Sequence, residues 1–256
     1  MQLLVSVRDS GEVEAALDGG ADIIDAKEPA RGALGPVAPD RLPAIDDCVP
    51  DDVPFSLALG DATSEAEVVA GIAMLPLRRR PAPVFLKLGI SAAATGGLER
   101  LLATAVRAAG NHPASPRLIA VEYADSKPRR FPPNHIVETA AQAGAAGVLI
   151  DTAIKDGRTL FAWWTESRLR AWIDDARGRG LGVAVAGSLG VSELPRVVGL
   201  SPDILGVRGA ACVGGRVGVV QADRVRALRA ALAGESQAAA NRQSRGASRG
   251  PQSILK

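Results

Sequence analysis

Residues 21–27 read Ala-Asp-Ile-Ile-Asp-Ala-Lys, a short apolar run that ends by placing two opposite charges where a protein core is expected. In a β-strand, residues two apart share a face, so Asp25 and Lys27 point to one side while Ile24 and Ala26 point to the other. A buried strand that ends with an acid and a base on the same face is typical of a functional site.

The rest of the chain alternates between apolar runs of strand length and helical segments, with turn signals between them. We expect strands at residues 3–7, 23–27, 55–59, 84–88, 118–123, 147–151, 182–186 and 204–207. We expect helices at residues 13–17, 40–46, 65–75, 98–109, 135–143, 161–179, 191–198 and 223–232. Eight strand-and-helix units in this order predict an α/β protein with the (β/α)8 fold, a TIM barrel; an open doubly wound sheet is the alternative.

Length and composition favour one globular domain followed by a tail. A chain of 256 residues, 47% of them hydrophobic, can bury one sizeable core, which we place at residues 1–233. Residues 234–256 are rich in Ser, Gln, Ala and Gly, so we expect a disordered basic tail there. The tail has four basic side chains and one acidic, so the formal charge of +2 becomes −1 for the body, which argues against a nucleic-acid partner.

Targeting and redox signals are weak in this sequence. The apolar run at the N-terminus is too short for a signal peptide or a membrane span. Cys48 and Cys212 lie far apart and outside any CxxC pattern, which is typical of a reducing compartment. We therefore expect a cytoplasmic protein without a membrane partner. The oligomeric state, including a homo-oligomer, is left open.

Lysine is rare in this chain. Only five of its 30 basic residues are lysines, at positions 27, 87, 127, 155 and 256. An amine can lose its proton and act as a base or form an imine, whereas a guanidinium in a protein effectively cannot. The few retained lysines are therefore candidates for chemistry.

Three of these lysines and two aspartates lie on even-numbered strands or in the loop that follows one. Lys27 ends the second expected strand after Asp25, Lys87 lies near the end of the fourth, and Asp151 ends the sixth, with Lys155 four residues later. In a TIM barrel, inward side chains from alternate strands share a layer, and the chemistry takes place at the C-terminal ends of the strands. We therefore expect these five residues to meet at the barrel mouth.

Such a cluster favours a neutral amine, because burial and neighbouring ammonium groups both disfavour the charged form. A neutral amine can attack a carbonyl carbon and form an imine, and the two aspartates can relay protons in an aldol or dehydration sequence. The alternative is that each lysine forms a structural ion pair with a carboxylate.

The last two expected strands run into glycine-containing loops. One loop contains Gly187 and Ser188, and the other contains Arg208 and Gly209. Loops after the seventh and eighth strands are the usual phosphate site in this fold, because backbone N–H groups can approach an anion there. We expect these four residues to bind a substrate phosphate. Tight turns alone are the alternative for the glycines.

Metal chemistry has little support in the sequence. His112 and His135 have no partner at metal-ligand spacing, so surface or capping roles are the simpler interpretation. We expect neither a metal nor an organic cofactor.

Four segments of the sequence resemble the (5-formylfuran-3-yl)methyl phosphate synthase family, also called 4-(hydroxymethyl)-2-furancarboxaldehyde-phosphate synthase. They are residues 21–29, residues 149–161 with the run Asp-Thr-Ala-Ile-Lys-Asp-Gly, residues 186–188, and residues 206–212. The match spans essentially residues 3–233, and the Asp-Thr-Ala-Ile-Lys-Asp-Gly run is its most specific part.

The resemblance implies a TIM barrel that condenses two molecules of glyceraldehyde 3-phosphate into a furan aldehyde phosphate, with release of phosphate and water. It implies that this product feeds methanofuran or methylofuran synthesis. By the same resemblance, Lys27 forms the imine, Lys87 accepts a proton, and Asp25, Asp151 and Lys155 belong to the active centre.

The sequence departs from the family pattern in two places. Glu28 and Ala33 stand where Asn and Ser are expected, and residues 213–217 look shorter than the corresponding family segment. Two other functions stay open: a simpler class I aldolase acting on triose phosphates, and a non-catalytic barrel that binds a phosphometabolite or RNA.

Overall fold

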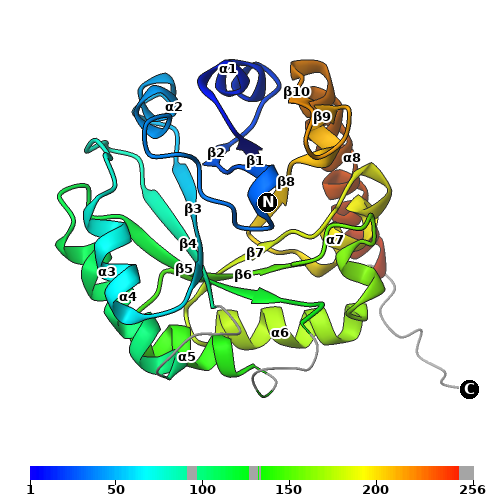
Figure 1. Ribbon diagram of the computed structural model, residues 1–256. Coiled ribbons are helices and arrows are strands. Elements are labelled where there is room, and N and C mark those ends of the chain that lie inside the picture. The colour runs from blue at the N-terminus through cyan, green and yellow to red at the C-terminus, as the bar shows by residue number, and fades with distance from the viewer. Residues whose placement is uncertain (91–96, 127–131, 133, 248–256) are drawn as a thin grey trace, which may run out of the picture.

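A closed barrel of eight parallel strands forms the body of the protein (Figure 1). The computed structural model describes residues 1–90, 97–126, 132 and 134–247, with side chains described as far as residue 241. Each strand pairs with the next, and the last pairs with the first, which confirms the predicted TIM barrel. The strands are β1 (Gln2–Val7), β2 (Ile23–Ala26), β3 (Phe55–Ala62), β4 (Val84–Ile90), β5 (Arg117–Tyr123), β6 (Gly147–Asp151), β7 (Gly182–Val185) and β8 (Ile204–Val207).

Helices surround the barrel on its outside (Figure 1). They are α1 (Ser10–Asp18), α2 (Leu42–Cys48), α3 (Glu65–Ala73), α4 (Leu98–Asn111), α5 (His135–Ala143), α6 (Glu166–Gly178), α7 (Leu194–Leu200) and α8 (Ala222–Ala247). Short 3-10 helices lie at η1 (Pro29–Arg31), η2 (Leu160–Ala162), η3 (Val191–Glu193) and η4 (Gly209–Ala211). After η4, β9 (Cys212–Val213) and β10 (Val219–Val220) pair as a small antiparallel hairpin.

Two helices differ most from the expected boundaries. Residues 161–179 do not form one helix, because Thr165 caps a new start: its side chain accepts a hydrogen bond from the backbone N–H of Arg168. Helix α8 does not end at residue 232 but continues to Ala247, through an Ala- and Gln-containing segment with good helix propensity. Residues 234–247 are therefore helical, and the rest of the expected tail lies outside the described residues. The division into a catalytic domain and a tail stays a prediction.

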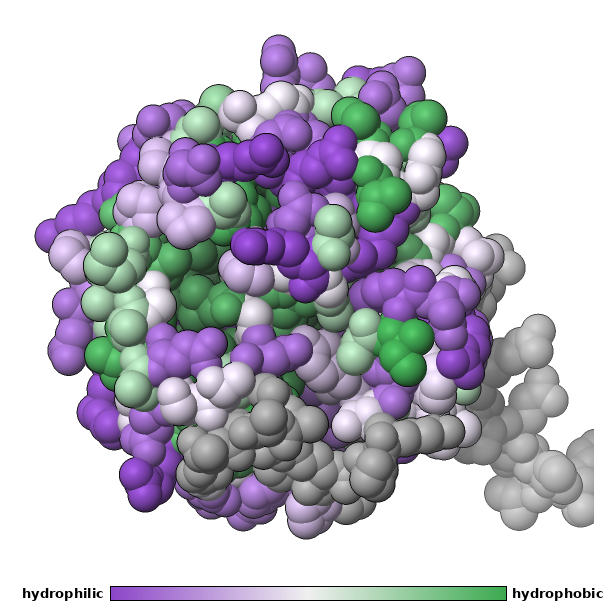
Figure 2. All heavy atoms as spheres, in the orientation of Figure 1, coloured by the Kyte–Doolittle hydropathy of each residue, from purple (hydrophilic) through white to green (hydrophobic). Residues whose placement is uncertain are grey.

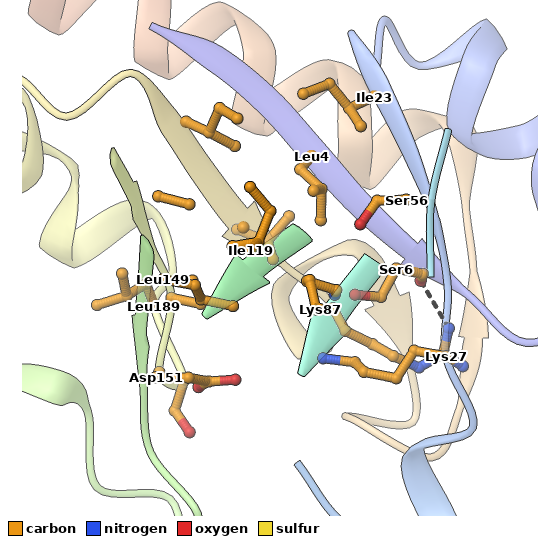
Figure 3. A pocket seen from close by; sticks show the side chains of 18 of the residues that line it. Leu4, Ser6, Ile23, Lys27, Ser56, Lys87, Ile119, Leu149, Asp151 and Leu189 are labelled. Atoms are coloured by element: carbon orange, nitrogen blue, oxygen red, sulfur yellow. Dashed lines mark hydrogen bonds between the residues drawn. The ribbon is translucent and has the colours of Figure 1, made fainter. Parts of the chain in front are cut away.

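The two faces of the strands differ in their side chains. Leu3, Val5 and Val7 of β1 are fully buried in the layer between strands and helices. The inner face has large apolar residues, which usually fill a TIM barrel, among them Leu4, Ile23, Ile119 and Leu149 (Figure 3). It also has small residues, namely Ser6, Ser56, Ala184, Ala186 and Gly206, and the barrel keeps a cavity of about 680 Å³.

The loop after β2 covers part of the barrel mouth. Leu34 from this loop is buried against Ala58, Val121 and Leu149, which come from β3, β5 and β6. Figure 2 shows a hollow on this face of the molecule, with apolar side chains at its base and hydrophilic ones around it. In the described part of the chain, no helix is both long and apolar enough to cross a membrane.

A buried ion pair joins α1 to the end of β8. The Glu12 carboxylate accepts hydrogen bonds from Arg208 Nη1 at 2.7 Å and Nη2 at 3.1 Å, and both side chains are almost fully buried. Glu12 also accepts bonds from the backbone N–H groups of Arg8 and Val220. One carboxylate therefore fixes α1, β8 and β10 relative to one another.

We expect Glu12→Gln to lower the free energy of unfolding by about 3–5 kcal/mol, because it leaves the Arg208 charge buried without its partner. Urea denaturation followed by circular dichroism measures this change. Glu14→Gln on the exposed side of the same helix is the matched control and should change the free energy by less than about 0.5 kcal/mol. Equal effects of the two variants would contradict the role given to Glu12.

Candidate active site

The strand ends bring the predicted charged residues together. Lys27, Lys87, Asp151 and Lys155 line the barrel cavity, and Asp25 contacts one of them directly. Figure 3 shows Lys27 and Lys87 extending side by side, with Asp151 on another wall of the cavity. The placement expected from the even-numbered strands is therefore observed, while the chemical roles of these residues stay a prediction.

Asp25 and Lys87 form a buried ion pair across β2 and β4. Lys87 Nζ lies 2.6 Å from Asp25 Oδ2, and Ser6 Oγ donates to the same oxygen at 2.7 Å. The second oxygen, Oδ1, is buried and has no hydrogen-bond partner among the described residues. Lys87 is thus held in place by a carboxylate whose other oxygen can still accept a hydrogen bond or a proton.

Asp151 and Lys155 form a second pair at the end of β6. Lys155 Nζ lies 2.7 Å from Asp151 Oδ1 and donates to Thr152 Oγ1 at 3.1 Å. Asp125, which follows β5 and is buried, accepts hydrogen bonds from the backbone N–H groups of Ala153 and Ile154, each at 2.7 Å. Asp125 therefore fixes the loop that carries Lys155. Sequence reasoning missed this residue, although an acid just after a strand end was a usable signal.

Lys27 is the lysine of the cluster without an ion pair. It is 8% exposed, and within the described chain its amine makes no hydrogen bond and lies within 4.0 Å of no carboxylate. Burial, and then the charge of Lys87, lower the pKa of Lys27 from 10.5 to about 8, while Asp151 and Asp25 act in the opposite direction. A substantial fraction of this amine is therefore neutral near pH 8.

Two consecutive residues with positive φ shape the loop after β7. Gly187 has φ +112°, and a Cβ there would lie 3.1 Å from Leu160 Cβ, so a larger residue is disfavoured. Ser188 follows with φ +55°. Within the described residues, the backbone N–H groups of Ser188 and of Gly209, in the loop after β8, make no hydrogen bond. Both residues line the cavity.

Arg208 lies at the cavity wall, but its guanidinium is turned into the protein. Its five N–H groups donate to Ser6 O, to Arg216 O, to Gly218 O and twice to Glu12. No donor is left for a phosphate in this arrangement. The structure thus favours Arg208 as a residue that positions the β8 loop, contrary to its expected direct contact with phosphate.

The other residues considered from the sequence, His112 and the two cysteines, lie in environments typical of structural residues. His112 is buried and follows the last turn of α4, where its backbone N–H donates to Ala109 O. Its ring Nδ1 accepts from the backbone N–H of Ala114, and its Nε2 lies 3.0 Å from Leu75 O, so the ring joins the segments that follow α4 and α3. Cys212 is buried and Cys48 is exposed, and both are free thiols. Across the described ranges, no group of three or more His, Cys, Asp or Glu side chains is arranged to hold a metal ion.

Comparison with known proteins identifies the family. A family model described as 4-HFC-P synthase matches residues 3–229. The chain belongs to the 4-HFC-P synthase family. Proteins named (5-formylfuran-3-yl)methyl phosphate synthase are 34% identical in Methanothermobacter thermautotrophicus and 36% identical in Methanopyrus kandleri; each alignment covers 91% of this chain and 99% of the relative.

A bacterial relative and a solved structure extend the comparison. A protein of Methylorubrum extorquens, named as a putative (5-formylfuran-3-yl)methyl phosphate synthase, is 36% identical over 82% of each chain. The crystal structure of phosphoribosyl anthranilate isomerase from Thermus thermophilus superposes with a TM-score of 0.61 at 18% identity, over 91% of this chain and 99% of that one. The second likeness concerns the fold alone, and it agrees with the barrel described above.

For this member of the 4-HFC-P synthase family, we expect Lys27 to react with an amine-acylating reagent in a pH-dependent way with a midpoint near 8. Lys87→Met should move this midpoint upward, because it removes a positive charge that lowers the Lys27 pKa. Mass spectrometry of the peptide containing Lys27, after brief labelling between pH 6 and 11, measures the midpoint. A midpoint near 10.5 in the native protein, or a downward shift in the variant, would contradict the electrostatic description.

Proposed function

We propose that this protein condenses two molecules of glyceraldehyde 3-phosphate into (5-formylfuran-3-yl)methyl phosphate through an imine on Lys27. The observation that carries the proposal is the arrangement of charges around Lys27. Lys87 and Lys155 each have a carboxylate partner at 2.6–2.7 Å, whereas Lys27 has a lowered pKa and no such partner in the described chain. The names of the relatives support this product. We also propose that the product feeds methanofuran or methylofuran synthesis, as the family resemblance implies.

The first step uses Lys27 as a nucleophile. Its neutral amine adds to the carbonyl carbon of one triose phosphate, and loss of water gives an iminium ion. The positive nitrogen acidifies the neighbouring C–H bond, so a base can remove that proton and leave a carbon nucleophile. Lys87 is the proposed base, after transferring its own proton to Asp25, whose Oδ1 has no other partner among the described residues.

The second substrate supplies the electrophilic carbon that the carbon nucleophile attacks. Ring closure and formation of the furan then require loss of two molecules of water and of one phosphate, and these departures are helped by proton donation to the leaving oxygen. The Lys155–Asp151 pair is the proposed donor, because it lines the same cavity and Lys155 is held at the end of an anchored loop. Addition of water to the final imine releases the aldehyde and restores the Lys27 amine.

The retained phosphate is proposed to lie at the loops after β7 and β8. Ser188 and Gly209 offer backbone N–H groups there that have no hydrogen bond within the described residues, and Gly187 gives the first loop its conformation. Arg208 supports these loops through its bonds to Glu12 and to backbone carbonyls. Neither a metal nor an organic cofactor is needed for this sequence of steps.

We expect Lys27→Arg to abolish reductive trapping of glyceraldehyde 3-phosphate by borohydride and to lower furan formation by at least about a thousandfold, because a guanidinium keeps its charge and forms no imine. Mass spectrometry locates the trapped adduct, and near-ultraviolet absorbance of the furan aldehyde measures product. Lys155→Gln is the contrasting variant: it should still trap substrate on Lys27 while forming product slowly.

The results separate the proposed reaction from its alternatives. A trapped adduct on another lysine, or trapping that persists in Lys27→Arg, would rule out the role of Lys27. Trapping on Lys27 with an open-chain sugar phosphate as product, and no absorbing furan, would indicate a simpler class I aldolase.

A further inference from the structure

Arg216 is a cavity residue that the sequence analysis did not single out. It lies between β9 and β10, and it lines the same cavity as Ser188 and Gly209. A Cβ added at Gly209 would lie 3.7 Å from Arg216 Cα, so the Arg216 backbone directly adjoins the β8 loop. The side chain then reaches across to the loop after β2, where its two terminal nitrogens donate to the carbonyls of Pro29 and Gly32.

The charge of Arg216 is not neutralised by a carboxylate in the described chain. Within the described residues its hydrogen bonds go only to backbone carbonyls, and no Asp or Glu oxygen there lies within 4.0 Å of its guanidinium. The neighbouring Arg208 differs in both respects, because Glu12 pairs with it and all five of its N–H groups are used. Two of the five N–H groups of Arg216 make these bonds, and the other three have no hydrogen-bond acceptor among the described residues.

A half-buried guanidinium without an acidic partner, beside backbone N–H groups that also have none, is a setting that favours an anion. We propose that Arg216 binds the phosphate group of the substrate, in the role that the sequence suggested for Arg208. The phosphate would lie between the Arg216 guanidinium and the N–H groups of Ser188 and Gly209. This inference deepens the proposed function: it needs a phosphate ester as ligand, but it does not depend on which bond is made next.

The bonds from Arg216 to the loop after β2 give phosphate binding a second consequence. This loop begins directly after Lys27 and carries Leu34 over the barrel mouth. A phosphate held by Arg216 would therefore favour the covered arrangement of the mouth, where the Lys27 amine is shielded from water. Loop fixation without phosphate binding is the competing role for Arg216, and the experiment must separate the two.

The test compares two aldehydes that differ only in the phosphate. Trapping on Lys27 by borohydride is measured against the concentration of glyceraldehyde 3-phosphate and of unphosphorylated glyceraldehyde, in the native protein and in Arg216→Gln. We expect the half-saturating concentration of the phosphorylated substrate to rise by about 10- to 100-fold, the usual effect of losing charge-assisted hydrogen bonds. The value for glyceraldehyde should stay within about twofold. Arg216→Lys should fall between, since it keeps the charge but loses the fork.

A second measurement does not require imine formation. Isothermal titration with inorganic phosphate should show binding to the native protein that weakens by at least about tenfold in Arg216→Gln. Arg31→Gln, on the exposed side of the same loop, is the matched control and should leave phosphate binding unchanged. Thermal denaturation by circular dichroism establishes that the variants are folded.

Three results would overturn the inference: equal phosphate binding by native protein and Arg216→Gln, equal shifts for the two aldehydes, or a native protein that neither binds phosphate nor prefers the phosphorylated aldehyde. The second result would assign Arg216 to loop fixation. Absence of any adduct on Lys27 in the native protein would instead count against the proposed reaction, and the titration with phosphate would still decide the role of Arg216.

Discussion

Two carboxylates are shared among three lysines inside the barrel, and this imbalance is the constraint on which the site depends. Asp25 forms an ion pair with Lys87, and Asp151 forms one with Lys155, each at hydrogen-bond distance. In the part of the chain that the structure describes, Lys27 has no carboxylate at hydrogen-bond distance, and burial together with the charge of Lys87 outweighs the opposite effect of Asp151 and Asp25 on its pKa. Burying an uncompensated ammonium costs free energy, and the protein relieves that cost by letting the amine lose its proton. The same physics that destabilises the charged form would supply the nucleophile of the proposed reaction.

A barrel that holds such a cluster needs space inside it. The small residues Ser6, Ser56, Ala184 and Gly206 leave room beside the lysine side chains. Most of the buried apolar residues belong to the outer layer, where the strands meet the helices. Ion pairs such as Glu12–Arg208 join elements far apart in the sequence. Much of the stability therefore comes from outside the cavity that holds the lysines.

The period-two pattern of the strands explains why so much was predictable from sequence. Asp25, Lys27 and Lys87 have positions fixed by strand parity, so their convergence followed once eight units were recognised. Arg208 shows the limit of this reasoning. Its strand position was foreseen, but its hydrogen bonds depend on Glu12, 196 residues away, which no local pattern reveals. Arg216 was missed for a related reason, since its position depends on a hairpin added after β8.

The division between strands and loops also explains how substrate selection can be linked to chemistry. Strand-borne lysines are held by the ladder and need little reordering when substrate arrives, which suits a step that requires exact alignment of the amine with a carbonyl carbon. Loop residues can respond to the ligand: Asp125 fixes the Lys155 loop through two backbone N–H groups, and Arg216 reaches the loop that follows Lys27. A phosphate bound by Arg216 would therefore affect the loop that covers the reacting amine. The strands alone do not provide this link.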